Sequence, residues 1–189
     1  QWLENARQIA MAMREHLEDR KLGGFFAASA DGTETIIARR KPLEDNAVAA
    51  QFLYLLGVAI KDEKLKLLAE KTLRATALPN VMRREGRVTG NLAMALELVS
   101  AGYVEFSVVG DPDDAAARAL LSAGQSVFEP RKLIHFEAPG RYPERDRAAM
   151  YICNDDACSL PIYDAALVAG EAIKFTPVAF ADGRSGIGL

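Results

Sequence analysis

Two stretches of this sequence are apolar around almost their whole circumference when drawn as helices, and this feature constrains the fold most. They cover residues 44–60 and 89–102. A helix on the surface of a domain carries one apolar stripe, whereas a helix that is apolar all round needs neighbours on several sides. A lone bundle of four helices would leave such faces exposed. We therefore expect the two helices to belong to a larger layered helical array, or to an oligomer.

Two further helices with a single apolar stripe are predicted beside the first of these. Residues 1–22 carry apolar side chains every three or four positions and stop at a Gly-Gly pair, and residues 62–78 repeat the pattern before Pro79. Because the connections are short, neighbouring helices should be antiparallel. The predicted stripes comprise Trp2, Ala6, Ile9, Met13 and Leu17 in the first helix and Leu65, Leu68, Ala69, Thr72 and Leu73 in the second.

The connection between the first two helices carries turn signals. Residues 25–37 hold an Asp-Gly dipeptide between apolar pairs, which predicts a small β-hairpin. Pro42 then precedes the apolar helix. The side chain of Asp45 or Asn46 is expected to cap this helix by accepting hydrogen bonds from its free backbone N–H groups.

The residue pattern changes after Gly102 from helical to strand-like. Residues 103–110 are rich in β-branched and aromatic side chains, which predicts a strand. A helix over residues 111–124 and strands over residues 132–138 and 147–154 are predicted to follow. A strand–helix–strand unit of this length favours a right-handed parallel crossover.

The turn VVGDPDD between the first strand and its helix is the place where a phosphate-binding loop would lie. It lacks the glycine fingerprint, and its aspartates would repel a phosphate, so we interpret it as a capped helix start with Asp111 as the N-cap. We expect no cofactor. In the tail, residues 164–175 are predicted to be helical and residues 181–189 irregular.

Charge and composition exclude two classes of partner. The formal net charge is -3 with acids and bases interspersed, which argues against a nucleic-acid groove. Two short arginine-rich patches, residues 39–41 and 141–147, are interpreted as solvated surface. No apolar run approaches the roughly 20 residues that span a bilayer, so no membrane association is expected. Two cysteines favour a cytoplasmic location.

The segment YICNDDACSLP holds both cysteines, Cys153 and Cys158. Their spacing differs from the C-x-x-C redox motif. A turn over residues 154–156 could bring the sulfur atoms together, so a disulfide or redox-responsive pair is one interpretation. A zinc site would need both histidines, His16 and His135, as further ligands. We favour free structural thiols and keep the metal and redox interpretations as alternatives.

A polar junction, RRKPLEDN, precedes the first apolar helix and is the candidate catalytic site. Arg39, Glu44 and Asp45 lie in it, and a pair of carboxylates could perform acid–base chemistry on a sugar. The alternative interpretation is that Glu44 and Asp45 are a helix cap and its neighbour.

Four landmarks occur in a fixed order, and together they resemble a known family. They are GGFF, RRKPLEDNAVAAQFLYLL, YVEFSVVGDPDD and AMYICNDDACSLP. Their order is similar to the C-terminal part of the thioredoxin-domain-containing family that includes the spermatogenesis-associated thioredoxin-like proteins. The resemblance implies a thioredoxin-like domain followed by a six-hairpin toroid of the glycosidase and epimerase type. It reaches to about residue 162. The family's Pro-Ser-Gly-Asn before the buried helix is shortened here, and only Asp45 and Asn46 match that loop.

The resemblance and the residue pattern together lead to one expectation. The chain should be α+β, with residues 1–102 forming helical hairpins of a partial (α/α) toroid and residues 103–189 forming a small α/β segment. It would be a C-terminal fragment that serves as a structural or binding platform. Its partners would be the thioredoxin-like domain and remaining hairpins of the parent chain, or a second copy. A sugar isomerase, epimerase or glycoside hydrolase acting on a carbohydrate-like small molecule is the alternative, and a redox- or metal-responsive module is the second alternative.

Overall fold

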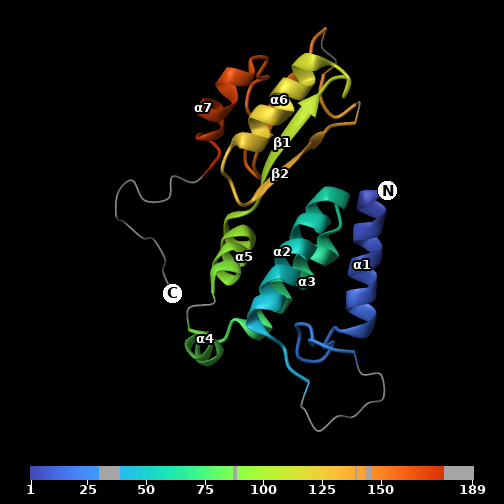
Figure 1. Ribbon diagram of the computed structural model, residues 1–189, viewed down its shortest axis with the longest axis vertical. Coiled ribbons are helices and arrows are strands. Elements are labelled where there is room, and N and C mark those ends of the chain that lie inside the picture. The colour runs from blue at the N-terminus through green and yellow to red at the C-terminus, as the bar shows by residue number, and fades with distance from the viewer. Residues whose placement is uncertain (30–38, 87–88, 139, 144–145, 177–189) are drawn as a thin grey trace. The chain divides into compact units, whose positions relative to one another are not determined.

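The computed structural model describes residues 1–29, 39–86, 89–138, 140–143 and 146–176. The chain divides into two compact units, Gln1–Gly102 and Tyr103–Leu189. Helices make up the described part of the first unit, and a small sheet with helices makes up the second (Figure 1). The predicted fold class, α+β with helices followed by a small α/β segment, is confirmed.

The first unit is built from antiparallel and crossing helices around one central helix, α2 (Figure 1). Its packing partners are α3 and α5. The helices are α1 (Trp2–His16), α2 (Leu43–Ile60), α3 (Glu63–Thr76), α4 (Pro79–Glu85) and α5 (Gly90–Ala101).

The packing of α2 against α3 depends on a close backbone approach. Lys61 adopts a left-handed conformation with φ 56° and ends α2, so the chain reverses at once into α3. A Cβ atom at Gly57 would lie 2.8 Å from the carbonyl oxygen of Asp62, which is closer than carbon and oxygen atoms can approach. The predicted inner face of α3 is confirmed, since all five of its residues are buried.

The two all-round apolar helices are only partly covered. Half of α2 is buried, and Val48 on its open side is 50% exposed. In α5 the buried residues are Leu92, Ala95 and Leu98, while Met94 and Leu96 are 38% and 40% exposed. Apolar surface on these helices is therefore left without cover in the described residues.

Among the described residues, α2 alone has the length and hydropathy that would allow a helix to cross a bilayer. Half of it is buried inside the structure, as expected for a core helix. Its length and composition therefore carry no membrane assignment.

Asn46 ties the start of α2 to the preceding loop. Its Oδ1 atom accepts a hydrogen bond of 2.7 Å from the Phe25 N–H, and its Nδ2 atom donates to the carbonyl oxygens of Phe25 at 3.0 Å and Pro42 at 2.8 Å. The expected cap by Asp45 or Asn46 is wrong. The helix begins earlier, at Leu43 with Pro42 as N-cap, and the Asn46 side chain bonds to the preceding loop instead of capping the helix.

The predicted hairpin over residues 25–37 falls mostly on residues 30–38, which lie outside the described residues. At its start Phe25 pairs with Glu18 in an isolated antiparallel bridge. The carboxylate of Asp19 supports this corner by accepting from the Leu22 N–H at 2.9 Å and from Lys41 Nζ at 2.7 Å. The hydrogen bond from Lys41 lowers the pKa of Asp19 to about 2.

The second unit is a three-stranded sheet in the order β2-β1-β3. Strand β1 pairs in parallel with β2 and antiparallel with β3, so the predicted parallel strand–helix–strand unit is found. Helices α6 and α7 add apolar side chains to the core of one sheet face. The elements are β1 (Val104–Val109), α6 (Ala115–Ser126), β2 (Lys132–Phe136), β3 (Ala149–Cys153), a 3-10 turn η1 (Ala165–Leu167) and α7 (Val168–Ala172).

The N-cap of helix α6 lies three residues later than predicted. The N-cap is Asp114, whose Oδ1 atom accepts from the Ala116 N–H at 3.0 Å. Asp111 was the expected cap, but it forms a separate turn and accepts from the Asp113 N–H at 2.8 Å. The predicted helix over residues 164–175 is divided into η1 and α7, and residues 181–189 lie outside the described residues.

Replacing Asn46 should destabilise the first unit strongly. In Asn46→Leu the buried N–H and carbonyl groups of Phe25 lose their partners, so we expect the free energy of unfolding to fall by about 3 kcal/mol. Urea denaturation followed by circular dichroism would measure it. Val48→Ala on the exposed side of the same helix is the control and should stay within about 0.5 kcal/mol. Equal effects of the two changes would contradict this role.

Candidate functional site

The two faces of the sheet in the second unit differ in chemistry. Val104, Phe106 and Val108 alternate along β1 and face the apolar core shared with α6. Glu105 and Ser107 lie between them and face the other way, because successive side chains of a strand point to opposite faces. The strand register places the partners of these two residues on the same polar face, namely Leu133 and His135 of β2 and Tyr151 and Cys153 of β3.

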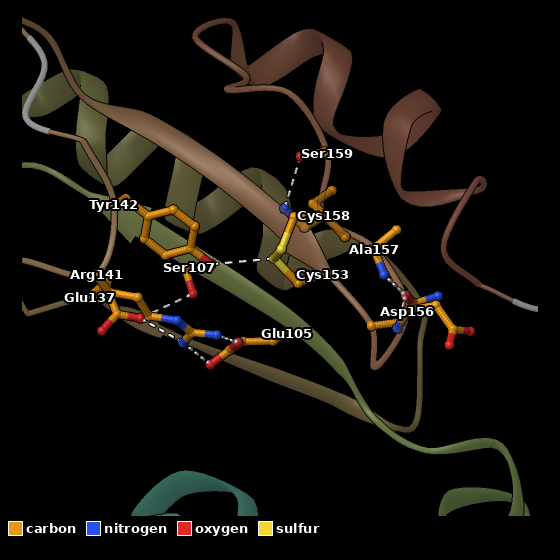
Figure 2. The surroundings of a disulfide bond; sticks show 12 residues. Glu105, Ser107, Glu137, Arg141, Tyr142, Cys153, Asp156, Ala157, Cys158 and Ser159 are labelled. Atoms are coloured by element: carbon orange, nitrogen blue, oxygen red, sulfur yellow. Dashed lines mark hydrogen bonds and ion pairs between the residues drawn. A yellow bond between two sulfur atoms is a disulfide. The ribbon is translucent and has the colours of Figure 1, made fainter.

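Arg141 lies over the polar face and pairs with two carboxylates (Figure 2). Its Nη1 and Nη2 atoms donate to the two oxygens of Glu105 at 2.8 and 2.6 Å, and Nη1 also donates to Glu137 at 2.9 Å. The side chain of Glu105 is 7% exposed, so its charge needs this partner. Hydrogen bonding to Glu105 raises the pKa of Arg141, which keeps the guanidinium charged at any ordinary pH.

His135 completes an ion-pair network on this face. Its Nε2 atom lies 3.4 Å from Glu137 Oε2 and 3.7 Å from Glu105 Oε1. One potential ligand atom from each of these three residues lies within 4.8 Å of the others, a spacing that a metal ion could use. Because Arg141 already donates hydrogen bonds to both carboxylates, we assign the cluster as an ion-pair network.

Two stacked tyrosines lie beside this network. The rings of Tyr142 and Tyr151 have centroids 4.1 Å apart and planes inclined by 15°. The Tyr142 hydroxyl lies 3.3 Å from Cys153 Sγ. The Tyr151 hydroxyl is buried and has no hydrogen-bond partner among the described residues. Burial raises the pKa of Tyr142, so its hydroxyl stays protonated at neutral pH.

The two cysteines form a disulfide bond (Figure 2). The favoured interpretation, two free thiols, is therefore wrong, and the zinc alternative loses its sulfur ligands. The cause is the turn between them. Asn154 Oδ1 accepts from the N–H groups of Asp156 at 3.0 Å and Ala157 at 2.8 Å, so the chain reverses and brings Cys153 and Cys158 to a Cα separation of 4.1 Å.

The candidate catalytic residues of the polar junction have separate partners. Arg39 donates to the carbonyl oxygen of Ala28 at 3.0 Å and stacks over the Phe26 ring. Glu44 Oε1 accepts a hydrogen bond from Asn91 Nδ2. Asp45 is exposed in the first turn of α2. Among the described residues, no hydrogen bond or ion pair joins these three side chains to one another.

Sequence reasoning missed the ion pairs of the polar face. Arg141 was interpreted as solvated surface, whereas its guanidinium holds a buried carboxylate from a strand 36 residues away. One signal was available. The alternation of Glu105 and Ser107 with three apolar residues in β1 shows that the second sheet face is polar. The partner of Glu105 could not be identified from that pattern.

Comparison with known proteins gives one distant similarity. The chain is 26% identical over 185 residues to spermatogenesis-associated protein 20 of Rattus norvegicus and to the protein of the same name in Mus musculus. Each match covers 86% of this chain and 23% of the relative, so the chain spans about a quarter of the length of the curated relatives it matches. No protein-family profile matches, and no solved structure matches. The similarity supports a relationship to that thioredoxin-domain family at a coarse level.

Opening the disulfide should lower stability modestly. A loop of about six residues is short, and the chain-entropy relation assigns its closure about 2 kcal/mol. We expect Cys153→Ala/Cys158→Ala to lose about that much free energy of unfolding relative to the oxidised protein, as measured in urea. Reduced wild-type protein is the matched comparison. A loss above about 5 kcal/mol would contradict the entropic account.

Acid should weaken the ion-pair network. Burial raises the pKa of Glu137, but hydrogen bonds from His135 and Arg141 outweigh it and lower the pKa overall. A lowered folded-state pKa gives stability that is complete above the unfolded value of about 4.3 and lost as the pH falls further. We expect the free energy of unfolding to decrease as the pH drops below about 4.5.

Arg141→Met tests which group causes this pH dependence. The variant should unfold about 1–3 kcal/mol more easily at pH 7, because Glu105 loses its partner, and should lose less stability between pH 5 and pH 3. Arg118→Met removes an exposed pair with Asp113 and should stay within about 0.5 kcal/mol. Denaturation curves with the same acid dependence in wild type and Arg141→Met would contradict the assignment.

Proposed function

We propose that this chain is a structural or binding module of a longer protein, and that the exposed face of α1 is where the rest of that protein packs. The observation that carries the proposal is the exposure of α1. Ala10 is the one buried residue of this 15-residue helix. The large apolar side chains Trp2 and Ile9, which share one side of the helix, are 86% and 55% exposed.

An open apolar groove along α1 supports the same proposal. It has a volume of about 530 Å³ and is lined mainly by Ile9, Ala12, Met13 and Leu17. Three of these residues belong to the stripe that the sequence predicts, and a stripe of this kind normally packs against a neighbouring helix. Large exposed apolar patches mark interaction sites.

The occupant that fits best is further helical chain of the same polypeptide. The relatives are about four times as long as this chain, since it covers 23% of their length. A layered helical array would use α1 as an inner helix with neighbours on both sides. A second copy of the chain is the competing occupant, and it is an outcome of the test below.

The sugar-enzyme alternative stays a prediction. It needs Arg39, Glu44 and Asp45 to converge on one pocket, whereas Arg39 and Glu44 are bonded to other groups and Asp45 faces solvent. Carboxylates that cleave a glycosidic bond must flank it at a fixed separation. The binding-module proposal therefore has the better support.

Oxidative footprinting of the native gene product tests the module. Met13 should be oxidised at least about fivefold more slowly there than in the 189-residue chain, because the docked segment covers the groove that Met13 lines. Met150 is fully buried and should be protected in both samples. Mass spectrometry reports the sulfoxide at each methionine.

Two results would overturn the proposal. One is equal oxidation of Met13 in the native product and in the 189-residue chain. The other is protection of Met13 that appears only at concentrations where light scattering gives the mass of a dimer, which would assign the face to a second copy.

A further inference from the structure

The two cysteines of the disulfide differ in exposure to solvent. Cys153 lies in β3 and is 3% exposed, whereas Cys158 follows the turn and is exposed. Thiol–disulfide exchange requires an incoming thiolate to reach one sulfur directly. Because Cys158 is the exposed residue of the pair, we expect such a nucleophile to attack its sulfur.

The buried sulfur has a hydrogen-bond donor placed against it. The Tyr142 hydroxyl lies 3.3 Å from Cys153 Sγ (Figure 2). A disulfide sulfur carries no proton, so the hydroxyl is the donor of this contact. Hydrogen bonding to a charged form favours that form, so Tyr142 would stabilise a thiolate that develops on Cys153.

The turn holds the two cysteines together independently of the sulfur–sulfur bond. The Asn154 N–H donates to the Ala157 carbonyl at 2.9 Å, and the Ser159 N–H donates to the Ile152 carbonyl at 2.8 Å. Cys153 and Cys158 face each other as an antiparallel bridge. Reduction therefore leaves two thiols that stay close. The disulfide can form again without a large rearrangement of the chain.

From these three features we propose that the Cys153–Cys158 bond is a thiol-exchange site, where an external dithiol attacks Cys158 and Cys153 leaves toward Tyr142. The proposal is independent of the docking of α1. It assigns Cys158 as the attacked sulfur and Cys153 as the leaving group. The presence of a disulfide alone does not make this distinction.

The exchange balances with the dithiol as the only co-reactant. Its first thiolate bonds to Cys158 Sγ, the Cys153–Cys158 bond breaks, and its electron pair stays on Cys153 as a thiolate, which then takes a proton from solvent. The second thiol of the reductant attacks its own mixed disulfide and releases Cys158 as a thiolate. The dithiol is oxidised to a disulfide, and this chain gains two electrons and two protons.

The first experiment locates the attack in the wild-type protein. The oxidised chain is mixed briefly with the monothiol glutathione, quenched with N-ethylmaleimide, and digested, and the peptide of residues 148–174 is sequenced by mass spectrometry. We expect glutathione on Cys158 and maleimide on Cys153 in about a tenfold excess over the reverse arrangement. Equal labelling, or glutathione mainly on Cys153, would overturn the proposal.

The second experiment measures the donor. Reduction of the oxidised chain by excess dithiothreitol should be about five- to tenfold slower in Tyr142→Phe, which removes the hydroxyl and keeps the stacked ring. Tyr151→Phe is the matched control, because its hydroxyl has no hydrogen-bond partner among the described residues and its removal should change the rate by less than about twofold. Circular dichroism checks that both variants fold.

The remaining outcomes are also decisive. Equal rates in Tyr142→Phe, Tyr151→Phe and wild type would remove Tyr142 from the exchange. Two titratable thiols in protein purified without reductant would show that the Cys153–Cys158 disulfide does not form, and this result would overturn the proposal. If Tyr142→Phe fails to fold, the labelling of the wild-type chain decides alone.

Discussion

The need to cover α2 is the constraint on which the first unit depends. This helix is apolar on nearly every side, so it can exist in water only with other helices packed around it. Helix α3 packs closest, because Gly57 lets the two backbones approach, and α5 covers a second side. Asn46 then fixes the loop before α2 by three hydrogen bonds, which hold the start of the helix in place. Apolar side chains of α1, α2 and α5 nevertheless stay exposed among the described residues.

Burial of a charge has the corresponding role in the second unit. Glu105 sits in the middle strand of the sheet, where an unpaired carboxylate would be costly. Arg141 meets it with two parallel hydrogen bonds, and this pairing brings the loop that carries Tyr142 onto the polar face. The stacking of Tyr142 on Tyr151 and the contact with Cys153 follow from that placement. One ion pair thus accounts for how the loop reaches the disulfide.

Periodicity predicted the elements well and their ends poorly. The buried face of α3, the parallel pairing of β1 with β2 and the α+β class all follow from hydrophobic spacing, which is a local property of the sequence. The two expected caps, by Asp45 or Asn46 and by Asp111, are wrong, because Asn46 and Asp111 accept hydrogen bonds from other backbone groups. Several polar residues next to a helix start compete for the cap, and spacing alone does not rank them.

The candidate site was harder to predict, because it depends on pairs that are distant in sequence. The contact between Arg141 and Glu105 joins residues 36 positions apart, which no local pattern reports. The disulfide was predictable as an alternative, since the Asn154 turn is visible in the sequence, but its formation depends on how the turn aligns β3 with residue 158.

The position of Trp2 has a practical consequence. It is the chain's one tryptophan, and it is 86% exposed on α1. The indole emission spectrum shifts to shorter wavelength when water leaves the ring. The intrinsic fluorescence of this polypeptide is therefore a built-in optical reporter of the surroundings of its first helix, which needs no attached dye.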